Sequence, residues 1–214
     1  REVRFPRGKV LGGSSSINAM LYIRGQAADY DGWRQLGLTG WAWDDVLPYF
    51  KKSEDHIDGA SPFHGVGGEL RVEHARVSWP LLETIRDAAQ AIGIEKIDDP
   101  NTGDNAGSSY FQVTQKRGRR WSAATAFLKP VLNRQNLQLL TNAVVRRVLF
   151  EGARAVGVEF EHGGRVLTAQ ARAEVGIGNK RVDRIVQPGK YGNHHPGHGQ
   201  DGSQGAQSRP AVGI

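Results

Sequence analysis

The chain has 214 residues, of which 38% are hydrophobic, and this length allows one domain with a substantial core or two small ones. It contains no cysteine and no run of about 18 apolar residues, so we expect no disulfide, no thiolate chemistry and no membrane-spanning segment. The formal net charge is +6, but half of this excess lies after residue 175, where five basic and two acidic residues occur, so we expect the remainder not to bind nucleic acid.

The first 60 residues open with a turn rich in glycine and serine, and two helices are predicted to follow. The first helix, Ala28–Leu36, places an aromatic pair three residues apart on one face, and Gly37 supplies its stop signal. For the second helix, Asp44 stands where an N-cap is expected, ahead of a short amphipathic stretch with Pro48 in its first turn.

The next segment is predicted to mix strands and helices. Glu69–His74 alternates between polar and apolar residues, which indicates a strand. A helix is expected to start with Pro80 in its first turn. Its apolar stripe comprises Leu81, Leu82, Ile85, Ala88, Ala89 and Ile92. Beyond a polar loop, Tyr110–Gln115 predicts a second strand, and Ser122 is expected to cap a short helix that Pro130 interrupts.

From about residue 137 to 173 the apolar pattern changes to a period of two, which is typical of half-buried strands. Four runs show it, and the last three are separated by segments that contain glycine: Leu137–Thr141, Val144–Phe150, Ala155–Glu161 and Val166–Ala171. The turns between the last three runs suit hairpins, so this region is predicted to form an antiparallel β-meander.

After Val175 the composition changes abruptly, with about a quarter glycine and no apolar period. Such a segment buries too little surface to offset its ordering entropy, so residues 176–214 are predicted to be disordered. We hypothesise that the reading frame breaks near this point. His194, His195 and His198 could bind a metal, but no acidic or cysteine partners surround them, so no metal site is expected.

The strongest chemical signal is the segment from Gly8 to Met20, which contains paired glycines followed by three serines. Gly12 and Gly13 allow the backbone to approach a ligand closely, and Ser14–Ser16, if they begin a helix, would offer donors to a pyrophosphate. Asn18 can donate and accept hydrogen bonds. A glycine–serine turn that only caps an ordinary helix is the alternative.

This segment, continued through Gly25 to Asp29, resembles the first signature of the glucose–methanol–choline (GMC) oxidoreductases. Further blocks in the same order also resemble that family: Asp31–Asp55, Phe111–Ala124 and Asn136–Glu159. The resemblance covers roughly residues 1–175. It implies a mixed α and β fold, namely a partial FAD-binding domain with helices and an antiparallel β-meander, plus part of the substrate domain.

The resemblance also implies which residues contact FAD. The expected set comprises Gly12, Gly13, Ser14 and Ser15 beside the pyrophosphate, Asn18, Ala19, Met20 and Leu21 at the flavin ring system, and Val145 at the adenine through its backbone. Some family members carry, at the position of Ile17, a histidine that is linked covalently to the flavin. Isoleucine has no nucleophilic atom, so non-covalent FAD is expected here.

Other parts of the family pattern are missing. We find no strand–GxGxxG–helix unit for the ADP moiety and no second signature after Val175. We also find no C-terminal histidine, paired with a second histidine or an asparagine, for proton transfer. No catalytic residue is therefore assigned, and the chain alone is expected to be inactive. The resemblance implies a fragment of an FAD-dependent enzyme that transfers hydride from the CH–OH group of a primary alcohol, choline or another, to flavin N5.

Two alternatives and several residues stay open at this point. The chain could instead be a non-catalytic truncated product or a binding module without flavin. A cytoplasmic location, or one peripheral to the inner membrane, is expected. The histidines outside the tail (His56, His64, His74 and His162) are predicted to be surface or packing residues, and Arg117, Arg119 and Arg120 to lie in a solvated loop rather than at a phosphate.

Overall fold

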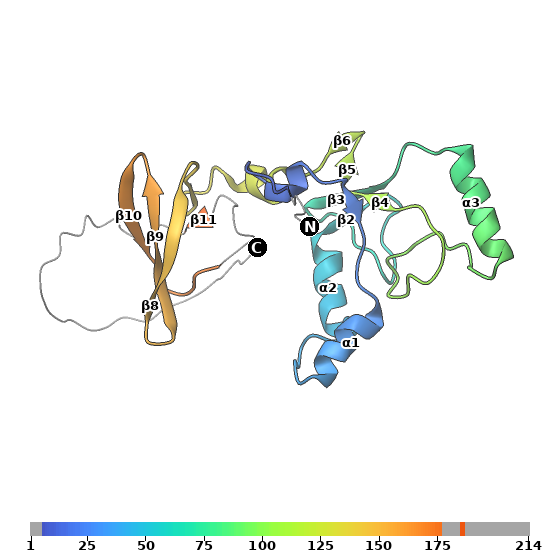
Figure 1. The fold of residues 1–214 in the computed structure, drawn as a ribbon, viewed down its shortest axis with the longest axis horizontal. Helices are drawn as coiled ribbons and strands as arrows, with labels where there is room; N and C mark the ends of the chain where they lie inside the picture. The colour runs from blue at the N-terminus through green and yellow to red at the C-terminus, as the bar shows by residue number, and fades with distance from the viewer. Residues whose placement is uncertain (1–5, 177–184, 187–214) are drawn as a thin grey trace, which may run out of the picture. The chain divides into compact units, whose positions relative to one another are not determined.

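The structure is a computed structural model that describes residues 6–176 and 185–186 of the chain (Figure 1). Two compact units divide it: unit 1 comprises residues 1–13 and 131–214, and unit 2 comprises residues 14–130. Both units combine elements that the sequence predicts. The fold is mixed α and β, with parallel and antiparallel strand pairs.

The first helix of unit 2, α1 (Ala27–Gln35), follows its prediction closely. The Gln26 backbone N–H donates to Asp29 Oδ2 at 2.8 Å, which satisfies one free donor at the start of the helix. Gly37, with a φ of 94°, ends it in the left-handed region that favours glycine. The rings of Tyr30 and Trp33 meet edge to face, with centroids 5.3 Å apart, so the predicted shared face is confirmed.

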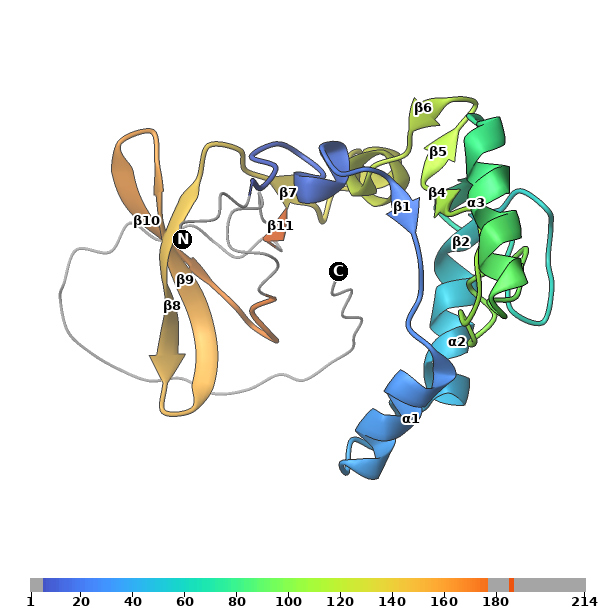
Figure 2. The ribbon, with the colours of Figure 1, turned by 45° about the vertical axis from the view of Figure 1, so that its right-hand side comes forward.

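The second helix, α2 (Trp43–Ser53), begins earlier than expected. The Ala42 backbone N–H donates to Asp45 Oδ2 at 3.0 Å, so the acidic side chain caps from the third helical position. The prediction of Asp44 as the N-cap is therefore wrong. The N-cap is Ala42, and the helix start is capped by the carboxylate of Asp45, which accepts a hydrogen bond from the residue before the helix. Pro48 consequently lies in the second turn, where its missing N–H leaves one backbone carbonyl without a helical partner. Figure 2 shows α1 and α2 in succession.

A four-stranded sheet supports unit 2, in the order β1 (Leu21–Tyr22), β4 (Gln112–Val113), β3 (Leu70–His74) and β2 (Glu54–His56). The pair β2–β3 is parallel and the other pairs are antiparallel. The strand predicted at 69–74 is confirmed. The sheet places Leu21–Tyr22, which directly follow the glycine–serine segment, beside Gln112–Val113, some 90 positions later in the chain.

The strand predicted over 110–115 is interrupted at Thr114. Its backbone N–H donates to Met20 O at 2.8 Å, and its carbonyl accepts the Trp121 N–H at 2.9 Å. After this break the chain forms a small hairpin of β5 (Gln115–Lys116) and β6 (Arg119–Arg120). The alternating pattern could not reveal the break, because Thr114 is fixed by partners far away in the sequence.

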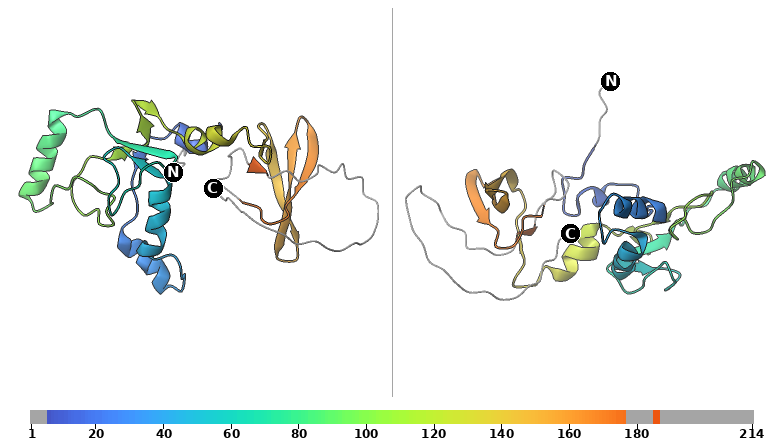
Figure 3. Two further views of the ribbon diagram at one scale, coloured as in Figure 1. Left: turned by 180° about the vertical axis from the view of Figure 1, so that it is seen from behind. Right: turned by 90° about the horizontal axis from the view of Figure 1, so that it is seen from below.

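Helix α3 (Pro80–Ala91) starts with Pro80 in its first position, as predicted. The predicted apolar stripe is present but not covered: Leu81 is 64% exposed, Ile85 55% and Ile92 78%. In both views of Figure 3, α3 lies apart from α1 and α2. Amphipathic spacing thus predicted the helix correctly, while no helix or strand of unit 2 packs on its apolar face.

The short helix after Ser122 is π-type, η2 (Ala124–Leu128), and continues into a 3-10 turn, η3 (Lys129–Val131), that contains Pro130. Ser122 Oγ accepts the Thr125 N–H at 3.4 Å, which agrees with its predicted capping position. Ala124, Ala126 and Leu128 are buried, so this segment contributes to the core of unit 2.

Unit 1 contains the predicted meander, with strands β8 (Val144–Glu151), β9 (Arg154–His162) and β10 (Arg165–Gln170) in the order β10-β9-β8. The run at 137–141 does not join it. Its central residues form β7 (Gln138–Leu139), which pairs with β11 (Ile185–Val186). Glycines at 152, 163 and 164 have positive φ and form the hairpin turns.

The core of the meander is small and apolar. Val158, Phe160 and Ala169 are buried, and half-buried Val145, Val148 and Leu167 pack against them. A Cβ at Gly157 would lie 2.4 Å from the Ala169 carbonyl oxygen, so close pairing of β9 and β10 requires glycine there. Among the described residues of the chain, no helix is long and apolar enough to cross a membrane.

Candidate functional site

The glycine–serine segment begins with a single 3-10 turn, η1 (Gly13–Ser16). Gly12 and Gly13 have φ values of 88° and 53°, which require glycine or a strained residue. The Ser14 carbonyl accepts the N–H groups of Ile17 and Asn18 at 3.1 and 2.9 Å. The helix that Ser14–Ser16 were considered to begin is thus only one turn, and no argument from a helix dipole applies to it.

Residues 18–20 form an exposed bend after this turn. Ile17, Asn18 and Ala19 are exposed, and Met20 has a φ of 63°, which is unusual for a residue with a side chain. The Met20 N–H donates to Asn18 Oδ1 at 3.0 Å, which holds the bend closed. The Ala19 N–H has no hydrogen-bond acceptor among the residues that the structure describes.

Hydrogen bonds from the segment at 114–123 hold the bend and the turn before it in place. Thr114 donates to Met20 O from its backbone N–H at 2.8 Å and from Oγ1 at 3.3 Å. The Ala123 N–H donates to Ser15 Oγ at 2.9 Å. Arg120 Nη1 donates to Ser15 O at 3.1 Å and to Asn18 Oδ1 at 2.9 Å. Arg120 is therefore half-buried and bound to this segment, which corrects its assignment to a solvated loop.

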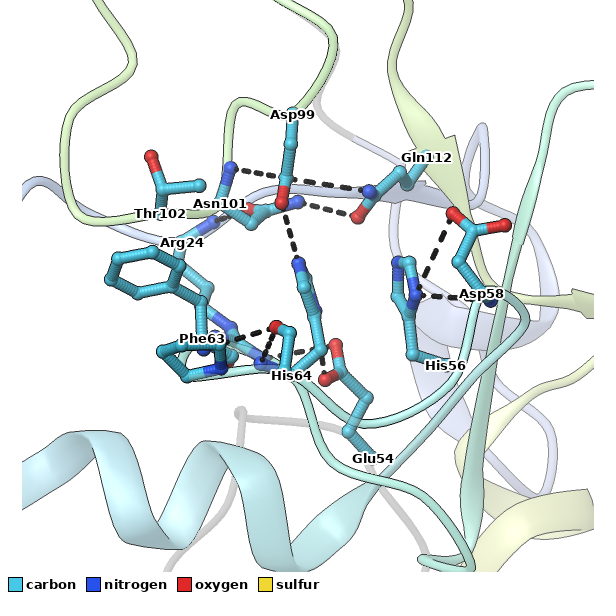
Figure 4. Close-up of polar contacts among 12 residues, drawn as sticks. Arg24, Glu54, His56, Asp58, Phe63, His64, Asp99, Asn101, Thr102 and Gln112 are labelled. Atoms are coloured by element: carbon cyan, nitrogen blue, oxygen red, sulfur yellow. Dashed lines mark hydrogen bonds and ion pairs between the residues drawn. The ribbon is translucent and has the colours of Figure 1, made fainter.

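A buried network of charged residues lies beside the strand that follows the bend (Figure 4). The ring of His64 is held between two carboxylates: Nδ1 lies 2.9 Å from Glu54 Oε2, and Nε2 lies 2.7 Å from Asp99 Oδ2. Burial alone would lower the pKa of His64, but the hydrogen bonds to Asp99 and Glu54 outweigh it and raise the pKa to about 9. His64 is consequently an imidazolium at neutral pH.

Glu54 is the centre of this network and has no exposed surface. Its Oε1 lies 2.9 Å from Arg24 Nη2, and its Oε2 accepts the Gly65 N–H at 2.9 Å. Burial would raise the pKa of Glu54, but the hydrogen bonds from His64 and Gly65 and the charge of Arg24 hold it below its ordinary value. Two cations and two carboxylates therefore balance within the network, as burial of charge demands.

Amide side chains connect the network to the sheet. The backbone N–H of Arg24 donates to Asn101 Oδ1 at 2.7 Å, and Asn101 Nδ2 donates to Gln112 Oε1 at 2.8 Å. Arg24 follows β1 in the chain, and Gln112 belongs to β4, the neighbour of β1. The network thus fixes the chain immediately after the exposed bend.

His56 stacks on His64, with ring centroids 3.9 Å apart and planes inclined by 25°. Burial, together with the positive charge of His64, lowers the pKa of His56. Its Nδ1 accepts the Asp58 N–H at 3.3 Å, so its proton resides on Nε2, which is buried with no partner among the described residues. The stack therefore joins a neutral imidazole to a charged one.

The sequence did not predict that His56 and His64 belong to a buried charged network. His56 and His64 are each 4% exposed, whereas His74 lies at the surface and contacts Asp58. His64 is more than a packing residue, because it carries a buried charge. The partners Arg24 and Asp99 are 40 and 35 positions from His64, so no local spacing could have revealed them. Among the described residues, no group of three or more His, Asp or Glu side chains could hold a metal ion, and the histidines at 194, 195 and 198 lie outside these residues.

Comparison with known proteins identifies the family. A family model described as GMC oxidoreductase matches residues 1–179. The chain belongs to the GMC oxidoreductases. An oxygen-dependent choline dehydrogenase of Sinorhizobium fredii is 47% identical over 175 residues, which are 82% of this chain and 32% of that protein. The corresponding protein of Brucella ovis is 45% identical over 183 residues, 86% of this chain and 33% of the relative.

Solved structures agree with this assignment to the GMC family. Pyridoxine 4-oxidase from Mesorbium loti is similar with a TM-score of 0.72 and 34% identity, over 77% of this chain and 33% of that one. An FAD-dependent oxidoreductase from Chaetomium thermophilum gives a TM-score of 0.71 and 30% identity, over 78% and 31%. The chain spans about a third of the length of the curated relatives it matches.

The residues of this GMC chain suit a flavin. The exposed bend offers the Ala19 N–H and the Asn18 side chain, so an aromatic ring with acceptor atoms could approach it. Gly12, Gly13 and Val145 belong to unit 1. Val145 lies on β8, an edge strand of the meander with a bulge directly after this residue. Edge strands keep one row of backbone groups unpaired, which suits the predicted backbone contact with adenine.

Proposed function

We propose that this chain forms the flavin-contacting part of an FAD-dependent oxidoreductase that acts on the CH–OH group of a primary alcohol. The exposed bend at Asn18–Met20, held in place by Arg120 and Thr114, is the observation that carries the proposal. The alcohol is a small molecule, and choline is the first candidate because the curated relatives are choline dehydrogenases.

In this proposal the FAD contacts are those that the resemblance implies. Gly12, Gly13, Ser14 and Ser15 lie at the pyrophosphate. Asn18, Ala19, Met20 and Leu21 lie at the ring system, and Val145 meets the adenine. FAD is bound non-covalently, since the side chain of Ile17, at the position where some relatives attach their flavin, has no nucleophilic atom.

Bound FAD would supply the acceptor for the hydride that leaves the alcohol carbon. The residues of this chain bind and orient the cofactor rather than transfer a proton. Asn18 and Ala19 offer hydrogen-bond donors, and β1, held by the buried charges of Glu54 and His64, keeps those donors at a fixed position. No catalytic residue is assigned, so we expect the chain alone to be inactive.

The domain boundaries belong to the same proposal. Residues 1–175 would be a partial FAD-binding region together with part of the substrate domain, and residues 176–214 would not be family sequence. A non-catalytic product or a binding module without flavin is the alternative that the next experiment separates from the proposal.

The test is an FAD titration of the purified 214-residue chain. Because the ADP-binding unit is missing, we expect the purified chain to be colourless, without stoichiometric flavin. Added FAD should nevertheless show saturable binding by fluorescence anisotropy, with a Kd between about 1 μM and 1 mM. A flat anisotropy curve up to millimolar chain would reject flavin contact and favour the alternative, and a chain purified with a full complement of flavin would show that the missing unit is not needed.

A further inference from the structure

The amide of Asn18 is held in one orientation. Its Oδ1 accepts two hydrogen bonds, from Arg120 Nη1 at 2.9 Å and from the Met20 N–H at 3.0 Å. An amide oxygen has two lone pairs, and an amide nitrogen can only donate. Rotating the amide by half a turn would place its N–H groups against two other donors, one of them cationic. The hydrogen-bond network therefore assigns Oδ1 to the protein side and Nδ2 to the exposed side.

The outward nitrogen has no acceptor among the described residues, and Asn18 is an exposed residue. On composition alone, asparagine could either donate to or accept from a ligand. The structure removes the second option, because the oxygen is already occupied twice.

The side chain of Arg120 is itself held in place by a second hydrogen bond, and it can therefore orient Asn18. Its Nη1 also donates to Ser15 O at 3.1 Å, and the hairpin that carries it continues to Ala123, whose N–H donates to Ser15 Oγ at 2.9 Å. The hairpin of β5 and β6 thus holds the glycine–serine segment at two residues, Ser15 and Asn18. The neighbouring Arg119 is exposed, and its side chain makes no hydrogen bond or ion pair with the described residues.

We propose that Arg120 is a positioning residue that locks the Asn18 amide with Nδ2 outward, so that position 18 presents a hydrogen-bond donor to an acceptor atom of the flavin. This inference rests on the proposed function. It deepens it by stating the polarity of the contact: a carbonyl oxygen or an unprotonated ring nitrogen is recognised, and a donor on the ligand is rejected. The positive charge of Arg120, next to the amide oxygen, also strengthens the N–H donor.

Four variants of the 214-residue chain test the proposal. Asn18→Asp keeps both oxygen contacts, and its charge favours Arg120, but it replaces the outward donor by an acceptor. Arg120→Ala removes the lock, and Arg120→Lys restores part of it. Arg119→Ala is the matched control, because it removes the same charge from the same hairpin without touching Asn18.

Two measurements separate the parts of the claim. The first is the pair of Asn18 side-chain N–H resonances in a ¹⁵N-labelled chain without ligand. We expect Arg120→Ala to move both resonances, Arg120→Lys to bring them part of the way back, and Arg119→Ala to leave them in place. The second is the FAD titration, in which Asn18→Asp and Arg120→Ala should weaken binding about tenfold or more. Asn18→Asp should unfold at no lower a temperature than the unmodified chain.

Several results would overturn the inference. Unchanged Asn18 resonances in Arg120→Ala would show that Arg120 does not position the amide. FAD binding by Asn18→Asp equal to that of the unmodified chain would show that no donor is recognised at position 18. If the unmodified chain binds no FAD, the proposed function fails and the ligand part of the inference fails with it, whereas the resonances still decide whether Arg120 positions Asn18.

Discussion

The two units of this chain distribute charge in opposite ways. In unit 1 the interior consists of Val158, Phe160 and Ala169, and the ion pair Arg146–Glu161 lies at the surface. In unit 2 the ion pair Arg24–Glu54 is almost completely buried. The meander is therefore stabilised by apolar contacts between neighbours in the chain, whereas the unit with the exposed bend depends on charges brought together from distant positions.

This difference has energetic consequences. An exposed ion pair contributes about 0–1 kcal/mol, since water solvates both partners when it breaks. Removing one partner of a buried pair leaves an uncompensated charge in the interior, which costs about 3–5 kcal/mol. All five tryptophans of the chain lie between residues 33 and 121, so tryptophan fluorescence reports on unit 2.

The largest effect is expected for Glu54→Ala. It leaves Arg24 as a buried cation without a carboxylate partner and removes one of the two carboxylates that hold His64, so we expect the free energy of unfolding of unit 2 to fall by about 3–5 kcal/mol. Urea unfolding followed by tryptophan fluorescence measures it. Glu161→Ala, which breaks an exposed pair in unit 1, is the control and should cost less than about 1 kcal/mol. Equal losses of stability from the two substitutions would contradict the claim that unit 2 depends on its ion pairs more than unit 1 does.

A somewhat smaller effect is expected for Phe160→Ala in the meander. Phe160 is 3% exposed, and its removal should cost about 3 kcal/mol, the low end for such a change, because a single thin sheet can partly collapse around the space. Far-UV circular dichroism should lose its β signal at lower urea concentration, while the tryptophan transition stays in place. A parallel shift of both transitions would mean that the units do not unfold independently. Phe160→Leu should retain most of the stability.

The buried charges of unit 2 also make its stability depend on pH. The pKa of His64 is raised to about 9 in the folded chain. A raised pKa stabilises the fold fully below the unfolded value of about 6.5, and this contribution disappears as the pH rises toward 9. It amounts to at most about 3 kcal/mol. The lowered pKa of His56 has the opposite effect on stability. Below about pH 6.5 the unfolded chain binds a proton at His56 that the folded chain does not, so this residue destabilises the fold as the pH falls.

We therefore expect the stability of unit 2 to fall between pH 6.5 and 9 in the unmodified chain. In His64→Gln this slope should be nearly flat. His74→Gln, at an exposed histidine, should keep the slope of the unmodified chain. The measurement is the urea midpoint by tryptophan fluorescence at several pH values, and a slope that survives in His64→Gln would assign it to another group.

The sequence predicted what depends on local pattern. The helices near residues 28, 44 and 80 and the three strands of the meander were recognised because their apolar spacing, turns and caps lie within a few residues of one another. The start of α2 was misplaced by the choice between two neighbouring aspartates. The segment that contains the exposed bend was singled out by its glycines and serines, and by a family resemblance that the comparisons confirm.

The sequence did not predict the interactions that hold the bend. Arg120 lies 102 positions after Asn18, and Asp99 lies 75 positions after Arg24. Contacts at such separations arise from the order of β1, β4, β3 and β2 in the sheet, and single residues carry no local sign of them. Histidines 56 and 64 were assigned to the surface or to packing for the same reason, because an imidazolium between two carboxylates is visible only after folding.

The flavin contact is tested most directly by a ¹⁵N–¹H correlation spectrum of the labelled chain with and without saturating FAD. We predict the largest shifts at the Ala19 backbone amide, the Asn18 side-chain amide and the Met20 amide, with only small changes on the apolar face of α3. Shifts confined to α3 or to the surface of the meander, or no shifts at all, would contradict the claim that the bend at Asn18–Met20 contacts the flavin.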